Sequence, residues 1–145
     1  MLTVLVVDDN PHLQIAFKKI LTAAGYKVKL ASDGEEGLRR AIEKPPDVIV
    51  LDMLLPRLGG VEVLRELKQN PATENIPVIA LSGLPQRNET KLKREGAVSY
   101  LEKSRLDGSA DLLQAIDYAL ILPRENEFRE SFFLPNASQD SKSSK

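Results

Sequence analysis

Five short apolar runs, separated by longer amphipathic segments, constrain the fold of this 145-residue chain more than any other feature. The first, third and fourth runs are apolar almost throughout, which is typical of strands that are covered on both faces. Such strands in alternation with helices predict an α/β fold, in which five β/α units build one parallel sheet with right-handed crossovers and helices on both faces. The predicted strands are 2–7 (LTVLVV), 26–30 (YKVKL), 47–51 (DVIVL), 76–81 (IPVIAL) and 97–101 (AVSYL).

The first predicted helix, 11–24, has signals for both of its ends. Asn10 and Pro11 suit a helix cap and first turn, and Gly25 suits the residue after the last turn. Six apolar residues between these ends keep the i, i+3, i+4 spacing that predicts one buried stripe. The predicted stripe is Leu13, Ala16, Phe17, Ile20, Leu21 and Ala24.

The other helical segments differ in how strongly they should be held. Ser32 and Glu35 form a capping-box pattern at the start of a helix over 33–43. The segment 85–96 (PQRNETKLKREG) holds one large apolar residue, Leu92, so a fourth helix there should be one of the looser elements. A solvated helix and a face that moves or binds a partner are both compatible with this composition. Two further helices are predicted at about 60–69 and 108–121.

Composition excludes several classes of function. The chain has 20 Lys plus Arg and 21 Asp plus Glu, so no overall charge draws it to nucleic acid or to a membrane surface. Cysteine is absent and His12 is the sole histidine, which excludes disulfides and a zinc site built from Cys and His. No apolar run approaches the ~20 residues of a membrane-spanning helix, and no signal peptide is recognisable, so we expect a soluble cytoplasmic protein.

Polar residues follow four of the predicted strands, at the point where each strand ends. Asp8 and Asp9 follow the first strand, Asp52 the third, Ser82 the fourth and Lys103 the fifth. In an open parallel sheet, sites form beyond the carboxyl ends of the strands, where the strand order reverses. If the order is 2-1-3-4-5, three carboxylates and one ammonium therefore meet in one cleft.

A bound cation explains why three carboxylates would be placed together. Carboxylates that share a site repel one another, and a hard divalent cation such as Mg²⁺, which prefers oxygen ligands, removes the conflict. The alternative is that Asp8 and Asp9 cap the first helix and bind nothing. A cap needs one acid and does not involve Asp52, so we favour a magnesium site.

Together these motifs resemble the receiver domain of two-component response regulators. The resemblance covers about residues 1–122 and rests on the Asp8–Asp9 pair, VIVLDMLLPRLGG around Asp52, LSG at Ser82, and YLEK ending at Lys103. It implies a doubly wound, flavodoxin-like (βα)₅ sheet with strand order 2-1-3-4-5, as in single-domain chemotaxis regulators. It also implies a domain boundary near residue 122, with a tail over 123–145.

The resemblance implies a phosphoacceptor and a metal site. Asp52 would accept a phosphoryl group from a phosphohistidine on a sensor histidine kinase or a histidine phosphotransfer protein. The Mg²⁺ would be held by Asp8, Asp9, Asp52 and the main-chain carbonyl of Leu54. The residues support this reading, because phosphoryl transfer mostly requires positioning and charge neutralisation.

Three more residues receive roles from the resemblance. Lys103 would pair with the phosphoryl oxygens, Ser82 would move to hydrogen-bond them, and Tyr100 would swing inward as the ring of the switch. Each has a simpler alternative: a surface lysine, a turn residue before a glycine, and a fixed core aromatic. A phosphoryl group adds about −1.5 to −2 charges and three acceptors, which can bias a two-state element.

These roles predict a phosphorylation-switched module that signals through protein contacts, with at most self-phosphorylation and self-dephosphorylation activity. A phosphorylation-independent pseudo-receiver scaffold and a receiver fragment of a larger hybrid kinase or regulator are the alternatives. A haloacid-dehalogenase-type hydrolase is disfavoured, because Asp52-Met53-Leu54 lacks the second acid of that family. No DNA-binding domain is recognisable, so direct binding of nucleic acid is not expected.

The sequence departs from the receiver pattern near the site. Receivers usually place proline after the conserved lysine, whereas Ser104 follows Lys103 here. A cis bond before a non-proline residue costs ~2.5–4 kcal/mol, so we predict a trans Lys103–Ser104 bond. Leu54 and Leu84 flank the expected path of the attacking water, and we hypothesise that they lengthen the life of the phosphorylated state.

The tail contains an aromatic segment, 124–135, which carries three of the chain's four phenylalanines. This segment packs on its own domain, forms a dimer or partner interface, or is linker from a larger protein. A homodimer through the face of helix four, strand five and helix five is a further arrangement. The last ten residues are polar and expected to be disordered. The tail and the Lys103-Ser104-Arg105 run are also similar to stand-alone regulators that serve bacterial phytochromes.

Overall fold

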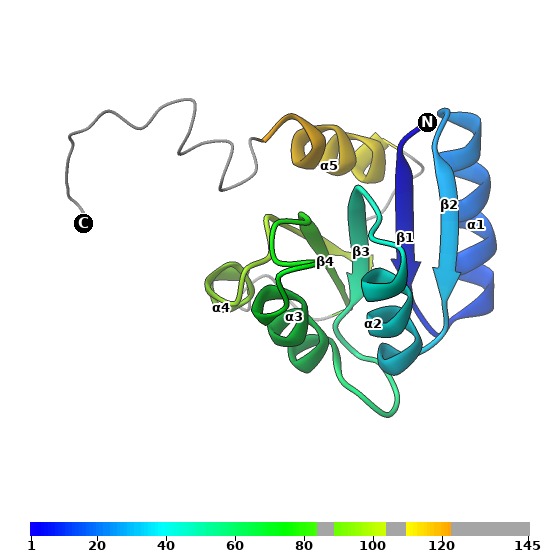
Figure 1. The fold of residues 1–145 in the computed structure, drawn as a ribbon. Helices are drawn as coiled ribbons and strands as arrows, with labels where there is room; N and C mark the ends of the chain where they lie inside the picture. The colour runs from blue at the N-terminus through cyan, green and yellow to red at the C-terminus, as the bar shows by residue number, and fades with distance from the viewer. Residues whose placement is uncertain (84–88, 104–109, 123–145) are drawn as a thin grey trace, which may run out of the picture.

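A five-stranded parallel sheet forms the centre of the computed structural model, which describes residues 1–83, 89–103 and 110–122 (Figure 1). The strand order is β2-β1-β3-β4-β5, which confirms the predicted fold class and topology. All four strand pairs are parallel, so the carboxyl ends of the strands meet at one edge of the sheet. The strands are β1 (Thr3–Val7), β2 (Lys27–Ala31), β3 (Val48–Asp52), β4 (Val78–Ser82) and β5 (Ser99–Glu102).

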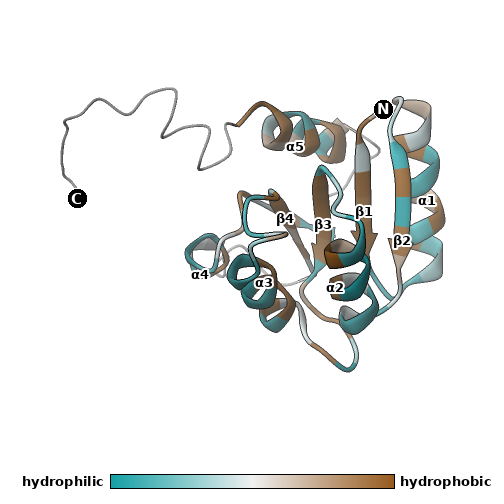
Figure 2. Cartoon of the chain, viewed as in Figure 1, coloured by the Kyte–Doolittle hydropathy of each residue, from teal (hydrophilic) through white to brown (hydrophobic). Residues whose placement is uncertain are grey.

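Helices cover both faces of the sheet and divide the core into two clusters. One cluster packs the sheet against α1 and α5, and the other packs it against α2, α3 and α4. Along β1, Val4 and Val6 belong to the first cluster, whereas Leu5 and Val7 belong to the second. This alternation explains why the strand is apolar from Val4 to Val7, with only Thr3 at its start polar (Figure 2). The helices are α1 (Pro11–Ala23), α2 (Gly34–Glu43), α3 (Gly60–Gln69), α4 (Glu89–Arg94) and α5 (Ala110–Ile121).

The predicted ends of α1 are confirmed. The side chain of Asn10 accepts hydrogen bonds from the backbone N–H groups of His12 and Leu13, and Gly25 has a φ of 98°. The predicted buried stripe is narrower than expected, since Ala16 and Ala24 are exposed. Phe17 and Leu21 are the fully buried residues of this helix, and Leu13 and Ile20 pack against the same cluster while partly buried.

The capping prediction for α2 is wrong by one residue. Asp33 is the N-cap, and its carboxylate accepts from the backbone N–H of Glu36 at 2.8 Å. The Glu36 side chain in turn accepts from the backbone N–H of Ser32 at 2.7 Å. Both Ser32 and Asp33 have an acid three residues later, and the Ser32 hydroxyl is used elsewhere, as the acceptor of a hydrogen bond from Gln14 Nε2.

The short helix α4 is held at one buried residue and at its C-terminal end. Leu92 is 4% exposed and belongs to the core on the α3 side of the sheet. Just after the helix, Glu95 forms a two-pronged ion pair with Arg65 of α3, with both N–O distances at 2.8 Å. These contacts explain how six residues stay on the sheet, and the expectation that α4 is one of the looser elements stays a prediction.

Some predictions lie outside the described residues. They concern the first part of the 85–96 helix, Leu84, the Lys103–Ser104 bond, the start of the 108–121 helix, and the tail at 123–145. Within the described residues, no helix is both long enough and apolar enough to cross a bilayer.

Candidate functional site

Three carboxylates meet at the carboxyl end of the sheet. The register pairs Val7 with Leu51, so Asp8, just after β1, and Asp52, the last residue of β3, lie at the ends of adjacent strands. One carboxylate oxygen from each of Asp8, Asp9 and Asp52 lies within 4.8 Å of the other two. Asp8 and Asp52 are buried, whereas Asp9 is exposed to solvent. The structure therefore brings together the three acids that the sequence predicted.

Asp8 is held in place by bonds to its backbone and its side chain. Its N–H donates to the Ala31 carbonyl at 3.0 Å, and its Oδ1 accepts from the Asn10 N–H at 2.8 Å. Gln14 Nε2 donates to the Asp8 carbonyl at 2.6 Å and to that of Ala31 at 3.2 Å. Gln14 thus fixes the strand end from the first turns of α1, a role that sequence reasoning did not identify.

Asp52 is fixed by the chain that follows it. Its Oδ1 accepts from the Leu54 N–H at 3.0 Å, and the Met53 N–H donates to the Leu81 carbonyl at 2.9 Å. A Cβ at Gly60, the first residue of α3, would lie 2.5 Å from the Asp52 carbonyl oxygen. Only glycine lets the start of α3 come this close to β3, and the Gly59-Gly60 pair in the sequence was the signal that could have revealed it.

Lys103 supplies the cation opposite the acids. Its Nζ lies 3.0 Å from Asp52 Oδ2 and 3.1 Å from Asp8 Oδ2, and its side chain is 29% exposed. Asp8 Oδ2 is buried and receives no hydrogen bond from the described residues. Its contact with Lys103 is therefore an ion pair whose geometry does not meet that of a hydrogen bond. One ammonium therefore faces two buried carboxylates and leaves negative charge uncompensated.

The electrostatics of the site follow from burial. Burial raises the pKa of the Asp52 carboxyl; the hydrogen bonds from Leu54 and Lys103 lower it by less, and the Asp8 charge adds to the rise. Burial alone would lower the pKa of Lys103. The hydrogen bonds and negative charges of Asp52 and Asp8 together outweigh burial, so the pKa of Lys103 is raised. The ammonium stays charged at neutral pH, while ionisation of Asp52 is costly without a further cation.

The residues present fit a hard divalent cation. Mg²⁺ prefers oxygen ligands and is commonly bound through one or two carboxylates and waters. The acidic cluster offers oxygens from three carboxylates, and Asp8 Oδ2 is a buried acceptor without a hydrogen-bond donor among the described residues. Leu54 is tied to Asp52 by its N–H, which keeps its peptide beside the cluster.

Ser82 and Tyr100 lie on the two strands beyond Asp52. Ser82 is the last residue of β4 and is 1% exposed, and its neighbour Leu81 is paired with Asp52 in the register. Tyr100 is partly buried on β5 and packs against the core on the α2, α3 and α4 side of the sheet. Ser82 thus lies at the sheet edge where the acids meet, and the switch roles of both residues stay predictions.

The family model of the response regulator receiver domain matches residues 4–117. The chain belongs to this family. The match covers most of the chain and includes the acidic cluster, Ser82 and Lys103, so the family resemblance drawn from the sequence is confirmed.

Curated receiver-domain relatives fall into two groups by length. The chain is 34% identical to protein PilH of Pseudomonas aeruginosa over 71% of this chain and 86% of that protein. It is 40% identical to a probable cyclic di-GMP phosphodiesterase of Vibrio cholerae over 70% of this chain but 23% of that protein. It spans between 15% and 42% of the length of the first four relatives, which are longer.

Solved receiver-domain structures have the same fold. The chemotaxis protein CheY4 of Vibrio cholerae matches with a TM-score of 0.76 and 28% identity, covering 83% of this chain and 99% of that one. The receiver domain of sensor histidine kinase PA1611 from Pseudomonas aeruginosa matches with a TM-score of 0.73 and 30% identity, covering 82% and 97%. The PA1611 structure has a magnesium ion coordinated in its active-site cleft.

Proposed function

We propose that this receiver acts as a response regulator whose phosphoacceptor is Asp52. The Asp52 carboxylate attacks the phosphorus of a phosphohistidine on a sensor histidine kinase or a histidine phosphotransfer protein. The bond between phosphorus and the imidazole nitrogen breaks, its electron pair leaves with the imidazole, and an acyl phosphate forms on Asp52. The burial of Asp52 between Lys103 and Asp8 supports this role.

A magnesium ion is part of the proposal. Asp8, Asp9, Asp52 and the main-chain carbonyl of Leu54 would hold it. Bound there, Mg²⁺ supplies charge neutralisation for the carboxylates and for the transferring phosphoryl group. The buried Asp8 Oδ2 makes no hydrogen bond within the described residues and has only the shared Lys103 ammonium as an ion-pair partner, and this observation supports a metal.

Three residues carry the response. Lys103 leaves its ion pairs with Asp8 and Asp52 and pairs with the phosphoryl oxygens, and the Ser82 hydroxyl donates a hydrogen bond to them. Tyr100 then packs further inward beneath β4 and β5. These movements change the α4–β5–α5 surface, which is where a target protein or a second copy of the chain would bind.

Signalling through protein contacts suits this chain better than the alternatives. Protein PilH, of which the match covers 86%, is a relative that consists almost entirely of this domain. A phosphorylation-independent scaffold would not need Asp8, Asp52 and Lys103 packed within ion-pair distance. The phosphohistidine of the donor protein takes its phosphoryl group from ATP. The proposal therefore implies a cytoplasmic protein.

One observation carries this proposal: Lys103 Nζ lies within 3.1 Å of both buried carboxylates of the acidic cluster. The test is incubation with acetyl phosphate and Mg²⁺, followed by intact mass spectrometry. We expect the added mass of one phosphoryl group, removable by hydroxylamine as an acyl phosphate is. A phosphorylated histidine phosphotransfer protein as donor is the second arm.

The matched variants are Asp52→Asn and Asp111→Asn, the second in the exposed first turn of α5. We expect loss of the adduct in the first and none in the second. A chelator should also abolish it. An adduct that persists unchanged in Asp52→Asn would overturn the assignment of the phosphoacceptor.

A further inference from the structure

A cavity of about 240 Å³ lies at the opposite end of the sheet from the acidic cluster. It is bounded by the first halves of β1 and β2, by the end of α2, and by the segment that follows α2. Asp8, Asp52 and Lys103 are not among its lining residues. The cavity is therefore separate from the proposed phosphoacceptor site.

The hollow exists because α2 does not cover the start of the edge strand. The register pairs Thr3 with Lys27 and Leu5 with Lys29, and residues two apart on a strand face the same side. Both lysines therefore project on the face that α2 packs against. Because α2 ends at Glu43, the face beyond it stays open, and the lysine stems form one wall of the cavity.

The lining is strongly basic in a chain whose net charge is −1. It contains four cations, Lys27, Lys29, Arg40 and Lys44, against one carboxylate, Glu43, which gives a local net charge of +3. None of the three lysines forms an ion pair with a carboxylate of the described residues. Like charges around one concavity raise its potential, which favours an anion.

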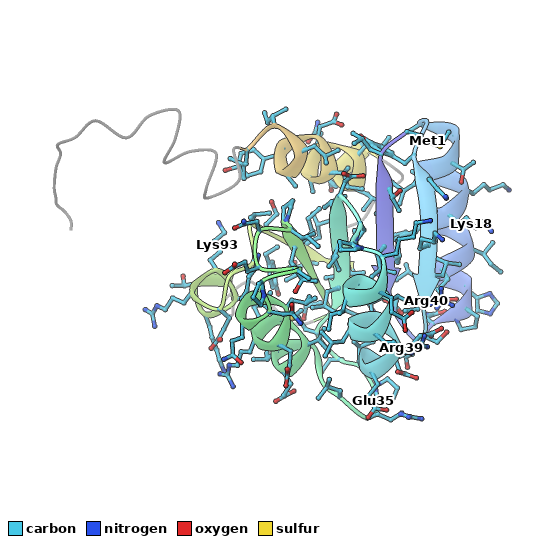
Figure 3. The ribbon with its side chains drawn as sticks, in the orientation of Figure 1. Met1, Lys18, Glu35, Arg39, Arg40 and Lys93 are labelled. Atoms are coloured by element: carbon cyan, nitrogen blue, oxygen red, sulfur yellow. The ribbon has the colours of Figure 1, made fainter. Side chains whose placement is uncertain are left out.

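The remaining charges near the cavity are partly engaged. Arg40, which Figure 3 shows on the side of α2 toward β2, pairs with Glu36 at 3.1 Å. Glu43 lies 3.8 Å from Arg39. The Asp47 carboxylate accepts from the Thr3 N–H at 2.7 Å, and the carbonyls at the end of α2 add partial negative charge. Among the described residues, the three lysines are thus the cations of this lining that have no carboxylate partner.

The floor of the cavity is apolar and its volume is small. Leu5 is 2% exposed and Pro46 is buried, and Pro45 completes the lining beside Lys44. A volume of this size equals about eight times the liquid volume of one water molecule, and it is below the ~300 Å³ at which drug-sized sites begin. An occupant would therefore be a small molecule with an apolar part and a charged group.

We propose that this cavity, the lysine pocket, binds a small phosphate monoester, with the phosphate among Lys27, Lys29 and Lys44 and the organic body on Leu5 and Pro46. A doubly charged phosphate matches several lysines better than a single carboxylate does. Lysines on an edge strand also discourage strand-to-strand association. That role needs neither the cavity nor Lys44, which lies outside the strand.

The test is a titration of the uniformly ¹⁵N-labelled chain with phenyl phosphate at low salt, with a chelator present so that the acidic cluster does not take up phosphate through a metal. We expect saturable shifts of the amides of Lys27, Lys29 and Lys44, and small shifts at Met53 and Leu54. Phenol at equal concentration should leave these signals unchanged, and inorganic phosphate should bind more weakly than phenyl phosphate.

The matched variants each remove two charges. Lys29→Met with Lys44→Met should weaken binding at least tenfold, and Lys27→Met with Lys44→Met provides a second pocket variant that spares the half-buried Lys29. Lys18→Met with Lys19→Met should leave the affinity unchanged, because both lysines are exposed on α1; Figure 3 shows Lys18.

Two results would overturn the lysine pocket. One is an equal loss of affinity for phenyl phosphate in the Lys18→Met, Lys19→Met variant and in the two pocket variants. That result would mean nonspecific attraction of the ligand to surface charge. The other is binding of a glutamate hexapeptide without binding of phenyl phosphate, which would assign the lysines to an acidic protein surface. Neither result depends on whether Asp52 is phosphorylated.

Discussion

Lys103 Nζ lies 3.0 Å from Asp52 Oδ2. The ammonium of Lys103 is therefore paired with the oxygen that an incoming cation or phosphoryl group would approach. The same nitrogen is 3.1 Å from Asp8 Oδ2. Lys103 therefore neutralises part of the acidic cluster when no metal is bound. A divalent cation must compete with it for the buried oxygens, and this competition leads to the first prediction.

Replacing Lys103 with methionine should tighten Mg²⁺ binding while slowing phosphorylation. The variant removes the ammonium that competes for Asp8 and Asp52, so we expect the dissociation constant for Mg²⁺ to fall about fivefold, or ~1 kcal/mol. Phosphorylation by acetyl phosphate should slow, because the phosphoryl oxygens lose their cationic partner. Isothermal titration calorimetry measures the first effect, with Lys91→Met on α4 as the control. Weaker Mg²⁺ binding in Lys103→Met would contradict the competition.

Replacing Asp52 with asparagine should stabilise the metal-free protein at neutral pH. Burial raises the pKa of this carboxyl in the folded protein. The Asp52 carboxyl therefore binds its proton more tightly in the folded protein than in the unfolded one. The stability that this proton contributes is lost as the pH rises from the unfolded pKa of Asp, ~3.9, through the raised folded pKa. Asparagine does not ionise, so the variant should gain on the order of 1 kcal/mol at neutral pH.

The raised Asp52 pKa also predicts that the stability gain of Asp52→Asn shrinks at pH values below the ordinary pKa of Asp. There both the parent and the variant carry a neutral group at residue 52. Urea unfolding at neutral and acidic pH, in the presence of a chelator, measures the difference. Asp9→Asn, at the exposed acid of the cluster, is the control and should change stability little. A parent that is more stable than Asp52→Asn at neutral pH would contradict a raised Asp52 pKa.

Much of this site could be predicted because strand order and strand ends fix it. Asp8, Asp52 and Lys103 each follow a recognisable apolar run, and the order 2-1-3-4-5 places them at one edge. The positions of Gln14 and Gly60 could not be derived in this way. Their roles depend on how closely a helix approaches a strand end, and local pattern does not determine that distance.

Local competition between two possible caps explains the α2 error. Ser32 and Asp33 both fit an N-cap with an acid three residues on, and the bond from Gln14 to Ser32 left the cap to Asp33.

The lysine pocket was missed for a different reason, which is not local. Lys27 and Lys29 resemble ordinary edge-strand residues in the sequence. Their shared face and the hollow beyond α2 become evident only from the register and the helix end.

Gly60→Ala should destabilise the chain and disturb β3 near Asp52. The added Cβ would lie 2.5 Å from both the Asp52 carbonyl oxygen and Met53 Cα, so backbone must move. We expect a loss of ~1–3 kcal/mol in urea unfolding, together with slower phosphorylation. Gly83→Ala is the matched control, because its Cβ would meet no atom within 4 Å. Equal stability of the two variants would contradict the close approach of α3.

Leu54→Asn should shorten the life of the phosphorylated state. The Leu54 side chain is 61% exposed and follows Asp52 by two residues, so it lies where water would reach the phosphoryl group. A polar amide there can orient the attacking water, whereas leucine excludes it. Loss of phosphate from the purified adduct, followed by intact mass, measures the rate. Slower loss in Leu54→Asn than in the parent would contradict the hypothesis, and Leu54→Ile is the apolar control.

The central claim is that Asp8, Asp9 and Asp52 share one divalent cation, and substitution of Mg²⁺ by paramagnetic Mn²⁺, which takes the same oxygen ligands, tests it most directly. We predict that substoichiometric Mn²⁺ broadens the amide signals of Asp9, Met53 and Leu54 first, and that Asp52→Asn weakens this effect. Broadening centred instead on the exposed acids of α2, with the signals around Asp52 unchanged, would contradict the account.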